Sequence, residues 1–273
     1  MRMRLRHGLG AGARGFVVGR LLPLAALLWA ASASAWGETG PQEPASGPAV
    51  SAPGPKYGPD AVPLPHEPGY LRTHPAPDFW ALIPHYVPQA GNSACSLASV
   101  AMLVNALRGV PPPAEAPYAT QASVLAAVGS ETWARETAEG GPGVRFAEFE
   151  GYVRQSLRAF GVEARIEVFR PEDDGPAALA ELRRWLRENE RSARDIALVY
   201  FNQGTLTGDW NGPHISPIGA YDAERRAVLV LDVDREWYVP YWSSDAGLLR
   251  AMLRPRPRES EPGGLIRVRL AGD

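Results

Sequence analysis

The stretch HISPIGAYDAERRAVLVLDV, residues 214–233, indicates the fold of this chain. It holds two apolar segments rich in β-branched residues, at 214–221 and 227–233, with the polar turn 222–226 between them. Two such segments joined by a short polar turn are typical of a β-hairpin. The stretch therefore predicts two neighbouring antiparallel strands.

Further helices and strands are predicted on both sides of this hairpin. Apolar residues at helical spacing predict a buried helix over 95–107 and an amphipathic helix over 146–160. Apolar runs and alternation predict strands over 162–168, 196–201 and 265–270, while helices are expected from Pro176 and over 246–253. Because helices come first and antiparallel strands later, we expect an α+β fold and not a doubly wound sheet.

The composition limits the chemistry that the chain can carry. Of its 273 residues 45% are hydrophobic, enough for one sizeable core or two small ones. Cys95 is the single cysteine, whereas disulfide frameworks, thiolate zinc clusters and iron–sulfur sites each need several. We therefore expect no metal site and no tightly bound cofactor.

The first 35 residues have the pattern of a signal peptide. They contain five arginines and no acidic residue, followed by an apolar run over 21–31 and by the small residues Ala33, Ser34 and Ala35. The run is shorter than the roughly 20 residues that cross a bilayer, so we expect export to the bacterial periplasm without stable membrane insertion after signal removal. The remaining chain would carry 23 basic and 30 acidic residues, a formal charge of −7, which disfavours nucleic acid as a partner.

The next stretch is dominated by proline, glycine, alanine and serine. Nine of the 33 residues at 36–68 are prolines, and large aliphatic side chains are almost missing, so burial cannot offset the entropy lost on ordering. Globular signals begin near Tyr70. We therefore expect a signal peptide over 1–35, an extended tether over 36–69 and one folded domain over 70–273.

Cys95 is the main candidate for chemistry. It begins the predicted helix over 95–107, where unpaired backbone N–H groups and the helix dipole stabilise an anion. That position favours a reactive thiolate. From the residues alone the alternative stays open that Cys95 is a small buried hydrophobe, as most free cysteines are.

A nucleophilic cysteine needs a base, and four histidines lie outside the signal peptide. Two lie in or near the tether, and His85 lies in the segment before the cysteine, where a surface or stacking role is expected. His214 begins a strand of the predicted hairpin, and Asp232 on the neighbouring strand could hold its ring. Asp234 would return to the same face two residues later, so the residues alone leave the choice of carboxylate open.

Gln89 is the candidate for stabilising a developing negative charge on a substrate. It precedes Cys95 by six residues and could donate a side-chain N–H to an oxyanion together with the backbone N–H of the cysteine. A glutamine in a loop is otherwise an ordinary polar residue.

The residues around these candidates resemble a known family. The stretches QAGNSACSLASVAMLVNAL at 89–107, HISPIGAY at 214–221 and LDV at 231–233 are similar to motifs of the phytochelatin synthase family of papain-like cysteine peptidases. The similarity covers about residues 80–255 and is most specific where His-x-Ser-Pro-Ile-Gly is followed by Leu-Asp-Val.

The resemblance implies a papain-like fold, in which a helical part carrying the cysteine packs on an antiparallel sheet carrying the histidine and the aspartate. By that resemblance Cys95 would be the nucleophile and His214 the general base and acid. Asp232 would orient the histidine, and Gln89 would donate to the oxyanion. The preference for Asp232 over Asp234 rests on the family's Leu-Asp-Val motif.

The resemblance also implies an activity. Family members attack the Cys–Gly bond of glutathione, release glycine and hold γ-glutamylcysteine as a thioester, which passes to water or to a second glutathione. Glutathione and related thiol peptides are therefore the implied partners, and Cd²⁺ or Zn²⁺ would enter as a metal–glutathione complex. Because short bacterial members tend towards hydrolysis, we expect hydrolysis to exceed transpeptidation.

The chain departs from the family at two positions and matches it at a third. Ser96 follows the cysteine where the family usually has glycine, so we expect it to alter packing in the first helical turn and the acyl pocket, and to contact substrate. Asp234 stands where a small residue is usual and adds negative charge. Arg235 matches a family arginine and is expected to meet a substrate carboxylate, with a surface salt bridge as the alternative.

Two other functions stay open at this point. One is a papain-like peptidase of the kind that trims bacteriocin leaders, although its cysteine is usually followed by Gly-Pro and it lacks Ser-Pro-Ile-Gly. The other is a catalytically silent periplasmic binding domain, in which Cys95 would not react. The sequence does not indicate an oligomeric state.

Overall fold

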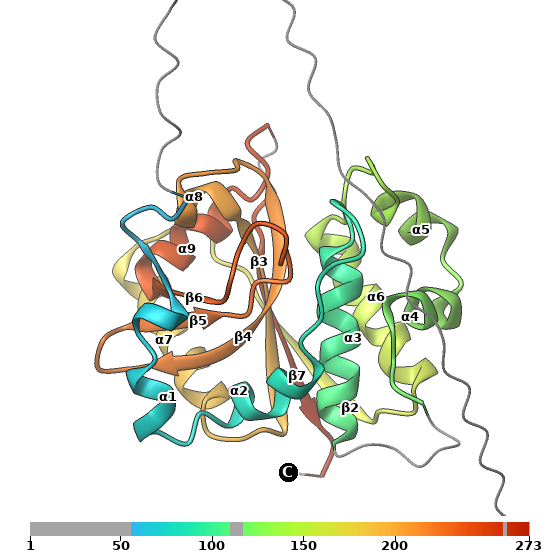
Figure 1. Cartoon of the computed structure of the whole chain (residues 1–273), viewed down its shortest axis with the longest axis horizontal. Coiled ribbons are helices and arrows are strands. Elements are labelled where there is room, and N and C mark those ends of the chain that lie inside the picture. The colour runs from blue at the N-terminus through green and yellow to red at the C-terminus, as the bar shows by residue number, and fades with distance from the viewer. Residues whose placement is uncertain (1–55, 110–116, 259–260, 273) are drawn as a thin grey trace, which may run out of the picture. The chain divides into compact units, whose positions relative to one another are not determined.

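One antiparallel sheet organises the described part of the chain (Figure 1). The computed structural model describes residues 56–109, 117–258 and 261–272. The strands within them are β1 (Ala61–Pro63), β2 (Ala164–Phe169), β3 (Asp195–Asn202), β4 (Pro213–Asp222), β5 (Ala227–Val230), β6 (Tyr241–Ser244) and β7 (Gly264–Leu270). Their order is β1-β6-β5-β4-β3-β7-β2, and all neighbours are antiparallel. The predicted α+β class is confirmed.

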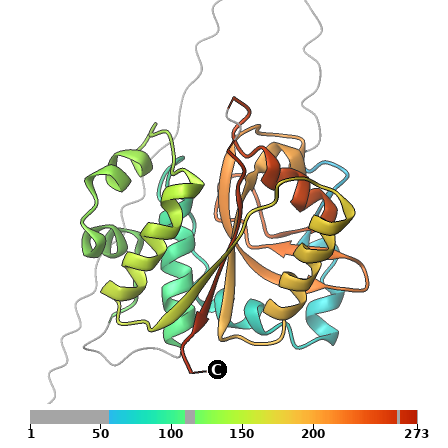
Figure 2. The same cartoon turned by 180° about the vertical axis from the view of Figure 1, so that it is seen from behind.

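Helices cover both faces of this sheet. They are α1 (Gly69–Thr73), α2 (Pro77–Leu82), α3 (Cys95–Arg108), α4 (Gln121–Val128), α5 (Glu131–Thr137), α6 (Phe146–Ala159), α7 (Pro176–Asn189), α8 (Gln203–Thr207) and α9 (Asp245–Leu253), with 3-10 turns at Leu64–His66 and Ile83–His85. Helices α3 to α6 lie on one side of β3, and α7 and α9 lie on the other (Figures 1 and 2). None of the helices in the described ranges is long and apolar enough to cross a membrane.

Strand β3 is buried along its whole length because both of its faces are covered. Its side chains alternate between two hydrophobic cores, with Ile196, Leu198 and Tyr200 in the core beneath α3 and α6, and Ala197, Val199 and Phe201 in the core beneath α7 and α9. A strand covered on both faces has a continuous apolar sequence. The predicted buried strand over 196–201 is therefore confirmed.

Helix α3 is buried on all sides. Every residue from 95 to 107 is buried, and the helix packs between β4 and the α4–α6 layer. The Ser99 hydroxyl donates a hydrogen bond of 3.1 Å to the Ile215 carbonyl of β4, which fixes the helix along the sheet. A helix held in this way gives the cysteine at its first position a rigid support.

The predicted hairpin is present as β4 and β5, but its register changes along its length. Next to the turn Asp222 pairs with Ala227, and the register then shifts between Ile218 and Ala220. Gly219 lies at this β-bulge, where a Cβ atom would lie 2.8 Å from Cγ of Leu231. Because a shift of one residue moves all later side chains to the other face, the bulge determines which face the end of the hairpin presents.

This shift places Asp232 on the face of His214. If the pairing next to the turn continued without the bulge, Asp232 would lie opposite Pro217. The side chain of Pro217 points to the face opposite that of His214. Past the bulge the Leu231 N–H donates to the Pro217 carbonyl at 2.9 Å, so Asp232 continues opposite Ser216 and shares the face of His214. The regular strand ends at Val230, earlier than the predicted Val233.

The folded part begins before the predicted boundary at residue 70. Ala61 pairs with Ser243, so β1 is the edge strand of the sheet, and the Leu64 N–H donates to the Pro240 carbonyl at 2.8 Å. An edge strand is held mainly by backbone hydrogen bonds, which leave no apolar pattern in the sequence. The prediction is therefore corrected for residues 56–69, while the signal peptide and the tether over 36–55 lie outside the described residues.

Candidate active site

Cys95 is the first residue of α3 and is 9% exposed. The N-cap residue Ala94 makes no side-chain hydrogen bond to the first turn, so no cap side chain occupies the backbone N–H groups there. These groups and the helix dipole favour negative charge at this end of the helix. The structure therefore gives the thiol the anion-stabilising position that the sequence predicted.

The loop that leads into α3 is held on two sides. The Gln89 N–H donates to the Val233 carbonyl at 2.8 Å, next to the end of the hairpin. On the other side, the Ala90 N–H donates to Oε1 of Gln121 at 2.9 Å. The loop thus joins the cysteine helix to the strand end that carries Asp232.

His214 and Asp232 form a buried pair. Nε2 of His214 lies 2.9 Å from Oδ1 of Asp232, and both side chains are almost completely buried. The edge of the His214 ring also packs on Phe201 of β3. Because Nε2 is engaged by the carboxylate, Nδ1 is the ring nitrogen left for another partner, and the nearby Cys95 side chain is one of the groups that raise the pKa of His214.

The two groups favour each other's charged form. Burial opposes protonation of His214, but the Asp232 carboxylate and the Cys95 side chain outweigh it, and the pKa of His214 lies well above its usual value. Burial likewise opposes ionisation of Asp232, but His214 and N–H donors from Asp234 and Gln203 bring its pKa below the usual value. The fold therefore favours the charged form of both the histidine and the aspartate.

Gln203 completes the contacts of the Asp232 carboxylate. No sequence pattern predicted a role for this residue. Its Nε2 donates to Oδ2 at 2.7 Å, while Oδ1 accepts the Asp234 backbone N–H at 2.9 Å in addition to the histidine. Gln203 is itself 1% exposed, and its Oε1 accepts the Tyr241 hydroxyl at 3.3 Å. No spacing pattern points to this glutamine, because it meets Asp232 only through the tertiary fold.

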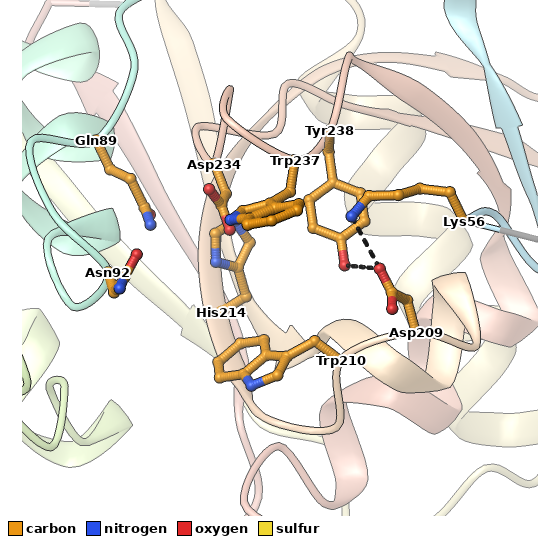
Figure 3. A pocket seen from close by; sticks show the side chains of 9 residues that line it. All are labelled: Lys56, Gln89, Asn92, Asp209, Trp210, His214, Asp234, Trp237 and Tyr238. Carbon is orange, nitrogen blue, oxygen red and sulfur yellow. Dashed lines mark hydrogen bonds and ion pairs between the residues drawn. The ribbon is translucent and has the colours of Figure 1, made fainter. Parts of the chain in front are cut away.

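The Gln89 side chain points to the same cavity as His214 (Figure 3). Its amide nitrogen faces the cavity in this view, and its Oε1 is buried and makes no hydrogen bond within the described residues. An amide N–H directed at the space beside the histidine can donate to an oxyanion. The oxyanion role of Gln89 stays a prediction.

The cavity has a volume of about 410 Å³. Its lining includes two exposed indoles, Trp210 and Trp237, which are 49% and 56% exposed. The described residues that line it are Lys56, Gln89, Asn92, Asp209, Trp210, His214, Asp234, Trp237 and Tyr238 (Figure 3). Aromatic surface with a few convergent polar groups is typical of a small-molecule site.

Asp234 is not the partner of His214. Its side chain lines the cavity, and burial raises its pKa, with a smaller contribution from the Asp232 charge. Its contact with the buried pair is made by its backbone N–H. The departure from the family therefore adds an acidic group to the cavity surface.

Two residues predicted to contact substrate lie elsewhere. Ser96 is completely buried, and its hydroxyl accepts a hydrogen bond of 2.9 Å from the Trp133 indole. Arg235 is exposed, and its guanidinium carbon lies 4.7 Å from the centre of the Tyr86 ring. Neither is among the residues that line the cavity: Ser96 contacts Trp133 in the core, and Arg235 lies over Tyr86, whose hydroxyl donates to the Asp232 carbonyl.

Three or more histidine, cysteine, aspartate or glutamate residues do not come together in a metal-binding arrangement in the ranges that the structure describes. His85 lies against Tyr118, with ring centres 5.4 Å apart, in agreement with the stacking role expected for it.

A family model described as phytochelatin synthase matches residues 71–264. No curated protein matches the chain at a significant level. The matched range is more than half of the chain and contains Cys95, His214, Asp232 and Gln89. The chain therefore belongs to the phytochelatin synthase family.

Proposed function

We propose that the protein cleaves the Cys–Gly bond of glutathione through a γ-glutamylcysteinyl thioester on Cys95. The observation that carries this proposal is the buried His214–Asp232 pair, whose histidine is also influenced by the side chain of Cys95. A cysteine helix packed on an antiparallel sheet that supplies histidine and aspartate is also the papain-like arrangement, which we propose for this domain.

In the first half-reaction the Cys95 sulfur attacks the carbonyl carbon of the Cys–Gly bond. His214 holds the proton of the thiol and delivers it to the glycine nitrogen as the C–N bond breaks, so that glycine leaves as a neutral amine. The negative charge on the carbonyl oxygen is met by Nε2 of Gln89 and the backbone N–H of Cys95. Asp232 holds the ring and stabilises its charged form.

In the second half-reaction an acceptor attacks the thioester. With water, His214 takes one proton, the C–S bond breaks, and γ-glutamylcysteine leaves as the acid. With a second glutathione, its amine attacks the thioester carbon and gives one proton to His214, the C–S bond breaks to free Cys95, and a phytochelatin leaves. The cavity of about 410 Å³ lies at the low end of the roughly 300–1,000 Å³ of ligand pockets, which favours one bound substrate and hence hydrolysis.

Metal enters this proposal only as part of the substrate. Cd²⁺ or Zn²⁺ would be bound by the glutathione thiol and would reach the cavity as a metal–glutathione complex. The signal-peptide pattern over 1–35 supports the further proposal that the enzyme works after export, in a bacterial periplasm.

The test is incubation of the full chain and its Cys95→Ala variant with glutathione, with and without Cd²⁺ or Zn²⁺, followed by mass spectrometry of the products. Glycine and γ-glutamylcysteine from the parent alone would support hydrolysis, and longer γ-glutamylcysteine chains would support synthesis. If neither appears, the substrate assignment fails. Cysteine-dependent cleavage of a peptide with a Gly-Gly leader would then identify a leader peptidase.

The proposed roles of the pair can be separated by substitution. His214→Ala should remove activity more completely than Asp232→Ala, because the carboxylate orients and stabilises the ring but does not touch the substrate. Acid-quenched samples of the parent during turnover should carry a mass increase of one γ-glutamylcysteinyl group on the peptide that contains Cys95. Active turnover without that adduct would contradict the thioester.

A further inference from the structure

Lys56 stands at the cavity and is the only lysine of the chain. Its Nζ lies 3.0 Å from Oδ2 of Asp209, which also accepts the Tyr238 hydroxyl at 3.0 Å. The ammonium group lies 4.5 Å from the centre of the Trp237 ring and 4.6 Å from that of Tyr238. An ion pair held against two aromatic rings therefore forms part of the cavity wall (Figure 3).

This ion pair faces the reaction centre across the cavity. Figure 3 shows Gln89 and Asn92 on one side, His214 towards the middle, and Lys56 with Asp209 on the other side. Lys56 precedes the range that the family model matches, residues 71–264. The segment in front of β1 thus adds a charged residue to the cavity that the family motifs do not supply.

We propose that the Lys56–Asp209 pair binds the α-carboxylate and the α-ammonium group of the γ-glutamyl residue. The inference rests on the proposed function, since it assigns one end of the same substrate. A free amino acid head group carries one positive and one negative charge on the same carbon. An adjacent lysine and aspartate present the complementary two charges, with Lys56 meeting the carboxylate and Asp209 the ammonium group.

The pair can bind these groups without separating. A lysine ammonium has three N–H donors and a carboxylate has about four acceptor positions, so the single contact between them leaves capacity on both. The hydrogen bond from Lys56 also lowers the pKa of Asp209, which keeps that carboxylate charged. Four alternating charges in a partly closed cavity attract one another more strongly than they would in bulk water.

The composition of the cavity wall supports the assignment to Lys56. Among the described lining residues, Lys56 is the one lysine or arginine, while Asp209 and Asp234 are acidic. Other contacts also anchor the segment. Oδ2 of Asp60 lies 3.7 Å from Nη2 of Arg250, and the Tyr57 hydroxyl accepts a hydrogen bond of 2.8 Å from the Val239 N–H. The segment would therefore stay attached to the sheet without the Lys56–Asp209 contact.

The test compares three acyl donors: glutathione, glutaryl-Cys-Gly without the α-amino group, and 4-aminobutyryl-Cys-Gly without the α-carboxylate. Lys56→Met should lower kcat/KM by about 10-fold or more for the two donors that carry the carboxylate, and leave 4-aminobutyryl-Cys-Gly unchanged. Asp209→Asn should weaken the two donors that carry the amine and spare glutaryl-Cys-Gly. Lys56→Arg should retain the preference for the carboxylate.

The matched control is Asp60→Asn, which removes an ion pair of the same segment away from the cavity. It should leave all three donors as in the parent. Equal losses for all three donors in Lys56→Met or Asp209→Asn, or no loss at all, would overturn the proposal, because a purely structural pair does not distinguish the head groups.

Calorimetric binding of the three compounds to Cys95→Ala, with and without Lys56→Met, separates this inference from the proposed function. Glutathione that binds through Lys56 but is not cleaved by the parent would sink the proposed reaction and retain the head-group site. Cleavage in the parent with binding that is indifferent to Lys56 would retain the reaction and sink the site. Absence of both binding and cleavage would overturn both.

Discussion

Replacing Gln203 with leucine should slow the reaction, although Gln203 acts through Asp232 and does not contact the substrate. Nε2 of Gln203 donates to Oδ2 of Asp232 at 2.7 Å, and both side chains are buried, so water cannot take its place. Hydrogen bonds to charged groups contribute about 1.5–3 kcal/mol. Since about 1.4 kcal/mol corresponds to a tenfold change in rate, Gln203→Leu should lower kcat/KM by about 10- to 150-fold.

The pH profile gives a second readout of the same substitution. The hydrogen bond from Gln203 helps to lower the pKa of Asp232 against its burial, so its loss should raise that pKa. A less stable carboxylate charge in turn lowers the pKa of His214. The acid limb of kcat/KM should therefore move to higher pH, because Asp232 must be ionised for the pair to work.

The assay is release of glycine from glutathione between pH 4 and pH 9, with thermal unfolding to verify the fold. Thr207→Val is the matched control, because its buried hydroxyl donates to the Gln203 carbonyl within the same helix α8 at 3.0 Å. It should cost about 1 kcal/mol of stability and leave the acid limb in place. A folded Gln203→Leu enzyme with parental kcat/KM and an unmoved acid limb would refute the reasoning.

Three further predictions concern packing and stability. Ser96→Ala should lower the unfolding free energy by about 1–3 kcal/mol and leave kcat/KM unchanged, because the Trp133 N–H loses its buried acceptor. A loss of kcat/KM at full stability would instead assign Ser96 to the substrate. Burial raises the pKa of Glu190 to about 7, so the unfolding free energy should fall as pH rises from about 4.5 to about 7, and Glu190→Gln should flatten that decline in urea titrations. Gly219→Ala places a Cβ atom 2.8 Å from Cγ of Leu231 and should cost about 1–3 kcal/mol together with activity, while parental values of both would show that the bulge adapts freely.

The sequence by itself determined the main elements and the position of Cys95 at the start of a helix. Local periodicity was sufficient for α3, α6, β3 and the β4–β5 hairpin, because each buries a regular face or is apolar throughout. The motifs around Cys95 and His214 were sufficient for the family, which the matched range confirms. These features depend on residues close together in the chain, so the sequence carries them directly.

The tertiary structure decided which groups surround the histidine. The bulge at Gly219 sets the register that places Asp232 on the face of His214, and the path of the chain after Val230 brings the Asp232 carboxylate to the ring. Gln203 and Asp232 are far apart in the chain, and their contact forms only when the chain folds, so no local pattern predicts it.

The place of Lys56 beside the cavity is a second example. Its segment precedes Tyr70, in a stretch whose composition predicted an extended tether, yet β1 pairs with β6 at the edge of the sheet. Backbone hydrogen bonds do not depend on side-chain pattern, and contacts between distant segments are fixed only when the strands pair. For that reason the sequence alone indicated Cys95, His214 and Asp232 as candidates, while the fold decided that Gln203 and Lys56 lie beside them.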